Sequence, residues 1–112
     1  MGNSRYKFRA WNLTSRGMKT HHQTLELMLY GNSFNYPIMQ YTGLKDKNGV
    51  EIYEGDIIHS GGLNYELIRE NGKACELHNS KDKYSPRFMF NCLNSIEVIG
   101  NIYQNKELLK CN

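Results

Sequence analysis

Residues 41–58, with the sequence YTGLKDKNGVEIYEGDII, decide the fold of this chain. Apolar and aromatic residues on both sides of residues 46–49 predict the two strands of a hairpin, and two turns compete between them. A two-residue Asn-Gly turn would place Asp46 opposite Glu51, and like charges directly opposite each other destabilise a strand pair. A type I turn followed by Gly49 in the left-handed conformation avoids this clash. We therefore predict the bulged turn, which gives the cross-strand pairs Lys45 with Glu51 and Leu44 with Ile52.

The same stretch carries four closely spaced carboxylates: Asp46, Glu51, Glu54 and Asp56. An EF-hand alignment centred on the turn places Leu44 and Gly55 where the first and last calcium ligands belong, so a calcium loop is not expected. On a strand Glu51 and Glu54 point to opposite faces, and no nearby His or Ser completes a catalytic set. We predict a solvated hairpin edge, with Asp56 accepting hydrogen bonds from turn amides.

Short strand patterns continue on both sides of the hairpin. Residues 54–56 redirect the chain into a strand over 57–59, and turn residues then separate further strands. The expected strands are 5–11, 57–59, 65–69, 74–78 and 96–99. Residues 24–30 and 102–110 fit either a short helix or a strand, and residues 88–93 are ambiguous. Many short strands separated by turns predict a mainly β fold with minor α content, built around a small barrel.

The N-terminal strand alternates basic and apolar residues, RYKFRAW over residues 5–11. Period two places Tyr6, Phe8 and Ala10 on one face and the basic residues with Trp11 on the other. Basic residues bind phosphates and an exposed Trp stacks on bases, so a nucleic-acid contact is one interpretation. Its candidate residues are Arg5, Lys7, Arg9, Arg16 and Lys19. The alternative is an edge strand whose charges discourage edge pairing, with Trp11 filling a seam between lobes.

Composition bounds the remaining possibilities. The 112 residues carry a net charge of +3, and no apolar run approaches the ~20 residues of a membrane span. Residues 1–11 lack the apolar segment of a secretory signal, and the three cysteines form no C-x-x-C pair, so we expect a cytoplasmic protein. Cys75 and His78 would point to opposite faces of a strand, and Cys92 is expected in the core with Cys75. We predict no metal, no cofactor and no enzymatic activity.

Three segments carry a family resemblance: KFRAW at residues 7–11, the hairpin stretch at 41–58, and IEVIGNIY at 96–103, which is followed by Glu-Leu-Leu at 107–109. Together they resemble the YopX family of phage and prophage proteins. The resemblance implies a β-rich fold with an SH3-like barrel in the C-terminal part and makes self-assembly plausible. It supplies no catalytic residues. The expected organisation is an N-terminal strand and lobe over 1–40 and an SH3-like barrel over 41–112, together forming one compact unit.

The functional expectation is a non-enzymatic phage or prophage accessory protein that acts in the cytoplasm of a bacterial host. It would bind a host or phage protein and associate with copies of itself. Aromatic residues dominate interface energetics, so the candidate contacts are Trp11, Tyr41, Tyr53 and Tyr103. Two alternatives stay open. One is nucleic-acid binding through the basic strand, and the other is counter-defence, either by sequestering a small nucleotide signal or by inhibiting a host defence protein.

Overall fold

The computed structural model describes residues 7–29, 36–68, 76–79, 87–88 and 95–110, and these contain nine strands and two short helices. The elements in chain order are β1 (Phe8–Asn12), β2 (Gly17–Lys19), α1 (His21–Leu29), β3 (Ile38–Lys45), β4 (Glu51–Tyr53), β5 (Asp56–Ser60), β6 (Leu63–Ile68), β7 (Glu76–His78), β8 (Arg87–Phe88), β9 (Glu97–Asn101) and α2 (Glu107–Lys110). The predicted mainly β fold with minor α content is confirmed.

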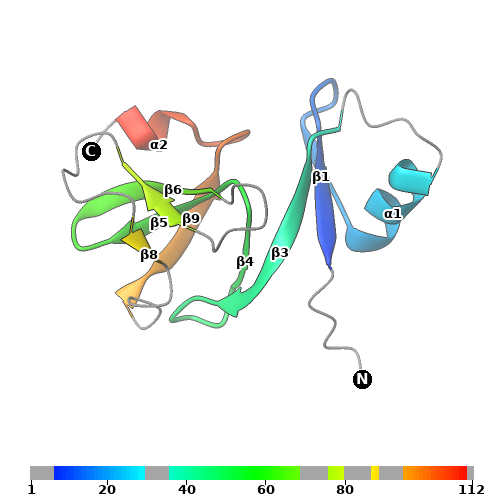
Figure 1. Ribbon diagram of the computed structural model, residues 1–112. Coiled ribbons are helices and arrows are strands. Elements are labelled where there is room, and N and C mark those ends of the chain that lie inside the picture. Colours follow the sequence, from blue (N-terminus) through cyan, green and yellow to red (C-terminus); the bar gives the residue numbers. More distant parts are fainter. Residues whose placement is uncertain (1–6, 30–35, 69–75, 80–86, 89–94, 111–112) are drawn as a thin grey trace.

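Two antiparallel sheets make up the architecture, with strand orders β2-β1-β3-β4 and β8-β7-β6-β5-β9. In the second sheet β5 to β8 form a meander, and β9 returns beside β5. The sheet curls into a half-barrel, as expected for a small β-barrel in the C-terminal part. Figure 1 shows the barrel on one side, β1 and β3 beside it, and α1 beyond β1. The chain is therefore layered as helix, N-terminal sheet and barrel.

The β3–β4 hairpin has the predicted bulged turn. Lys45 lies opposite Glu51, the Gly49 N–H donates to the Asp46 carbonyl at 3.0 Å, and Gly49 has a φ of 82°. The predicted main-chain pair of Leu44 with Ile52 is replaced by a bridge through a side chain. The Thr42 hydroxyl donates to the Ile52 carbonyl at 2.8 Å and accepts from the Leu44 N–H at 3.2 Å, within a shift of register along β3.

The hairpin also contributes to the barrel core. Ile52 of β4 is fully buried and packs in one apolar cluster with barrel residues. The other buried members of this cluster are Ile58, Tyr65, Leu67, Leu77 and Ile96. The strand before the 54–56 turn therefore helps to fill the same core as the strands after it, which ties the two sheets together through apolar packing.

Gly55 is the point where the N-terminal sheet passes into the barrel. Its φ is 83°, its N–H donates to the Leu67 carbonyl at 3.0 Å, and its carbonyl accepts from the Ile102 N–H at 2.9 Å. A Cβ at this position would lie 3.3 Å from the Met39 sulfur. The predicted redirection of the chain at residues 54–56 is confirmed, since β5 begins at Asp56.

We expect Gly55→Ala to lower the free energy of unfolding by about 2 kcal/mol, because left-handed backbone strain adds to crowding against Met39. Gly49→Ala is the matched control: its φ of 82° is nearly the same, but nothing lies within 4 Å of the added Cβ. This control should cost about 1 kcal/mol from strain alone. Urea unfolding of both variants measures the difference, and equal losses would contradict a packing role for Gly55.

Two segments that the sequence left open between helix and strand form helices. α1 begins with a reciprocal cap, in which the Thr20 hydroxyl accepts from the Gln23 N–H at 3.2 Å and the Gln23 side chain accepts from the Thr20 N–H at 3.0 Å. Residues 107–110 form α2. The ambiguous residues 88–93 are described only at Phe88, which ends β8. Cys75 and Cys92 lie outside the described residues.

Candidate functional site

Strand β1 lies between two layers, and its alternation separates them as predicted. Phe8 stacks on His21 of α1 with ring centroids 6.2 Å apart, and Ala10, on the same face of the strand, is fully buried. Arg9 and Trp11 point the other way, toward the barrel. We call the contacts between this face of β1 and the barrel the seam.

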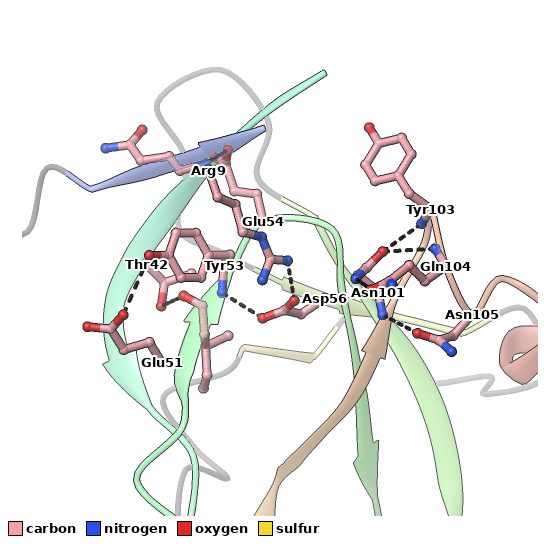
Figure 2. A network of polar contacts seen from close by, with 12 residues as sticks. Arg9, Thr42, Glu51, Tyr53, Glu54, Asp56, Asn101, Tyr103, Gln104 and Asn105 are labelled. Carbon is pink, nitrogen blue, oxygen red and sulfur yellow. Dashed lines mark hydrogen bonds and ion pairs between the residues drawn. The ribbon is translucent and has the colours of Figure 1, made fainter. Parts of the chain in front are cut away.

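An ion pair between Arg9 and Asp56 forms the centre of the seam (Figure 2). The Asp56 carboxylate also accepts from the Tyr53 N–H at 2.7 Å, and the Arg9 guanidinium lies 4.4 Å from the centroid of the Tyr53 ring. The Asp56 side chain is 1% exposed, and this burial raises its pKa, against the opposing effects of Arg9 and the Tyr53 N–H. The predicted bond from Asp56 to a turn amide is confirmed. The prediction that this carboxylate is solvated is wrong, because the seam covers it.

A second ion pair occupies the more exposed end of the seam. Lys7 Nζ lies 2.6 Å from a Glu51 carboxylate oxygen, and both side chains are about one-third exposed. Lys7 is also 5.5 Å from the centroid of the Tyr41 ring, which in turn packs on Tyr53 at a centroid distance of 5.4 Å. Burial raises the pKa of Tyr41 and of Tyr53, and the Glu51 charge raises both further.

Trp11 and Tyr103 close the third part of the seam. Their rings stack with centroids 6.4 Å apart, and Trp11 is 2% exposed. Arg16 lies 6.0 Å from the Trp11 ring and donates to the Tyr103 carbonyl at 3.5 Å. The Asn101 side chain holds the turn in place by accepting from the N–H groups of Tyr103 and Gln104, each at 2.9 Å (Figure 2). Trp11 therefore fills the space between the layers.

Asp46 fastens the hairpin to the barrel. One carboxylate oxygen accepts from the N–H groups of Asn48 at 2.8 Å and Val50 at 2.9 Å, and the other accepts from the Val98 N–H of β9 at 2.9 Å. Asp46 is 6% exposed, and its bonds to the Asn48 and Val50 amides give it the predicted role in the bulged turn. Burial raises its pKa, but the three N–H donors outweigh burial and hold the pKa below its usual value.

The residues proposed for nucleic-acid contact do not form one open basic face within the described parts of the chain. Lys7 and Arg9 pair with carboxylates, Arg16 lies against Trp11, and Lys19 is half-buried in β2. Arg5 lies outside the described residues. Of the aromatic candidates for a protein interface, Trp11 and Tyr41 are buried, whereas Tyr53 and Tyr103 keep part of their surface exposed.

Within the described ranges, no group of three or more His, Cys, Asp or Glu side chains is placed to hold a metal ion. Cys75, one member of the considered zinc pair, is outside those ranges. None of the helices that the structure describes is long and apolar enough to cross a membrane.

Sequence reasoning missed the outer face of α1. Leu25, Met28 and Leu29 are 36%, 44% and 80% exposed, and Thr24 is the one residue of this helix that is buried. The spacing i, i+3 and i+4 places the three apolar side chains next to one another on a helix. This spacing in the sequence could have predicted an apolar face on a helix. The partial alternation of Leu25, Leu27 and Leu29 obscured it, because alternation suggested a strand.

Comparisons with known proteins agree with this architecture. A family model described as "YopX protein" matches residues 14–110. The crystal structure of protein EF1440 from Enterococcus faecalis is similar, with a TM-score of 0.64 and 27% sequence identity over 92% of this chain and 96% of that chain. No curated protein matches the sequence. Because the family match spans most of the chain, this protein belongs to the YopX family.

Proposed function

We propose that the protein is a non-enzymatic accessory protein of a phage or prophage that binds protein through α1, with a second copy of itself as the first occupant of that surface. One observation carries the proposal: Leu25, Met28 and Leu29 are exposed side by side on a helix that covers the N-terminal sheet. The phage setting rests on the family to which the chain belongs.

The energetic argument concerns these three side chains together. Single exposed apolar residues are normal on a protein surface, as Leu13 and Val50 are here at 49% and 46% exposure. Leu29 differs because it is 80% exposed and has two apolar neighbours on the same helix. Fully burying a Leu or Met side chain contributes about 1.5–3 kcal/mol, so covering the cluster favours association.

A second copy fits this surface because a two-fold axis makes an interface self-complementary. With the axis at the centre of the cluster, two α1 helices cross antiparallel, and Leu25 of one helix lies near Leu29 of the other. A core of three side chains per copy is small, so we expect a weak, concentration-dependent dimer.

Sedimentation velocity over a range of micromolar to millimolar concentrations tests the proposal. We expect the wild-type sedimentation coefficient to rise with concentration, and Leu29→Lys to keep the protein monomeric. Val50→Lys is the matched control, since it introduces the same charge at an exposed apolar position in the hairpin, away from α1. A wild-type protein that stays monomeric throughout, or equal effects of the two substitutions, would contradict the proposal.

Nucleic-acid binding has less support as a function of this chain. The two cations of the N-terminal strand that the structure describes, Lys7 and Arg9, are held by Glu51 and Asp56 in the seam. A phosphate group would have to displace a carboxylate partner from each of them. Protein binding through α1 needs no such rearrangement.

A further inference from the structure

His21 makes a contact between α1 and β1 that depends on its protonation state. It is the first residue of α1, directly after the Thr20 cap. Its Nδ1 atom accepts a hydrogen bond from the main-chain N–H of Phe8 at 3.0 Å, and its ring stacks on the Phe8 ring at an interplanar angle of 17°. One imidazole therefore contributes a polar and an apolar contact to the same strand residue.

The hydrogen bond replaces a missing strand contact. The pairing of β2 with β1 runs from Gly17 opposite Asn12 to Lys19 opposite Ala10, so β2 ends before it reaches Phe8. On the other side Phe8 pairs with Gln40 of β3. The Phe8 N–H on the open side needs an acceptor, since unpaired main-chain donors are costly when they are covered. His21 supplies that acceptor and thereby joins the start of α1 to the edge of the sheet.

An imidazole can accept at Nδ1 only when that nitrogen carries no proton. The neutral ring must therefore hold its hydrogen on Nε2, and in the imidazolium both nitrogens are donors. Protonation would place two donors, the His21 Nδ1–H and the Phe8 N–H, opposite each other, so the hydrogen bond between them would be lost. It would also place a positive charge in the first turn of a helix, where the dipole disfavours cations. Imidazole side chains change charge between about pH 5 and 8.

We propose that His21 is an acid-sensitive latch that holds α1 on β1 when neutral and releases the start of the helix when protonated. The charged groups on the elements that pack against α1 are Arg9 of β1, which is turned toward Asp56, and Lys19 of β2. On α1 itself Glu26 lies 3.9 Å from His22, so its charge is directed to the neighbouring histidine. Among the described residues, these surroundings provide no carboxylate that contacts an imidazolium at His21.

Release would change what α1 presents to its surroundings. The helix covers Ala10 of β1 and buries its own Thr24, both of which are fully buried. Partial undocking would add this surface to the exposed cluster of Leu25, Met28 and Leu29. The latch itself does not depend on self-association, so it can be tested on the monomer.

Amide hydrogen exchange of the dilute full chain, followed by NMR at pH 8 and pH 5, tests the latch. After correction for intrinsic exchange rates, we expect protection of the Phe8 and Thr24 amides to fall about tenfold or more at pH 5, because the bond to Nδ1 is lost. The amides of Ile57 and Ile58 in β5 should keep their protection. The ring 15N shifts of His21 at pH 8 should show the Nε2–H tautomer.

His22→Gln is the matched control. His22 is the next residue of the same helix and 88% exposed, so its substitution removes a neighbouring imidazole without touching the bond between His21 and Phe8. We expect His22→Gln to keep the pH-dependent loss of protection and His21→Gln to abolish the pH dependence. The proposal is overturned if protection of Phe8 and Thr24 in the wild type is the same at both pH values. It is also overturned if His21→Gln retains the wild-type loss.

Discussion

Asp46→Ala is expected to lower the free energy of unfolding by about 3–4 kcal/mol, a large share of the stability of a small domain. The substitution removes the charged acceptor of three main-chain N–H groups, those of Asn48, Val50 and Val98. Two of these shape the hairpin turn, and the third fastens the turn to β9. Urea unfolding at neutral pH measures the loss.

Two further substitutions separate the contributions of the turn and of β9. Asp46→Asn keeps one oxygen acceptor but presents an NH2 group to the remaining amide, so it should cost about half as much. Asn48→Ala changes a neighbouring residue of the same turn. The Asn48 side chain makes only a long contact with Glu97, at 3.4 Å, so this substitution should lower the free energy of unfolding by about 0.5 kcal/mol or less. Equal losses for Asp46→Ala and Asn48→Ala would contradict the central role of the carboxylate.

The effect of Asp46 should also depend on pH. Its pKa is lower in the folded protein than in the unfolded chain, because the N–H donors outweigh burial. The stabilisation is therefore complete above the unfolded value near 4 and is lost as the pH falls through the lower folded pKa. The difference in unfolding free energy between wild type and Asp46→Ala should accordingly be smaller at about pH 3 than at pH 7.

Asp56→Ala is expected to destabilise the protein by about 3 kcal/mol, because it leaves Arg9 without its partner and the Tyr53 N–H without its acceptor. Glu51→Ala is the matched control within the same seam. It breaks the ion pair with Lys7, whose side chain is 30% exposed, and should cost less than about 1 kcal/mol. Chemical unfolding of the two variants makes the comparison, and similar costs would show that burial of the pair does not matter.

The double substitution Arg9→Met with Asp56→Ala should recover part of the loss seen in Asp56→Ala alone. The Arg9 Nε atom is buried and has no hydrogen-bond partner among the described residues, so the arginine is incompletely compensated even in the wild type. In Asp56→Ala the Arg9 guanidinium stays buried without a carboxylate partner. The double substitution also removes this unpaired cation, so its cost should be smaller. Strictly additive losses would argue that the two side chains are not coupled.

Local patterns were sufficient to predict the hairpin and most of the strands, but not β2. The bulged turn at residues 46–49 depends on one glycine with positive φ and on residues a few positions apart, and the alternation over residues 5–11 placed Arg9 and Trp11 on one face of β1. The β-rich fold followed from strand length and turn spacing, and the family from three short segments. The choice between helix and strand at residues 24–30 stayed open because a nine-residue helix offers only about two turns of periodicity, and the partial alternation of Leu25, Leu27 and Leu29 fits a strand as well.

The locations of the partners could not be predicted locally. Arg9 and Asp56 are separated by 47 positions and Asp46 and Val98 by 52, so no spacing rule connects them. Asp56 was predicted to be solvated because neighbouring residues are polar, and only the approach of another layer buries it. Two of the aromatic residues expected at an interface, Trp11 and Tyr41, are buried for the same reason, because the seam is filled by large side chains.

By itself, the sequence determined the local geometry, namely the turn that Gly49 permits, the two faces of β1 and the order of short strands. These features follow from backbone dihedral preferences and from the period of side chains along a strand. Only the tertiary structure decided what those faces contact. Packing of the barrel against the N-terminal sheet turned basic and acidic residues toward each other and buried Trp11. On the other side of β1, Leu25, Met28 and Leu29 of α1 stay exposed. Burial is a property of the whole arrangement, because it depends on which distant segments come together around each side chain.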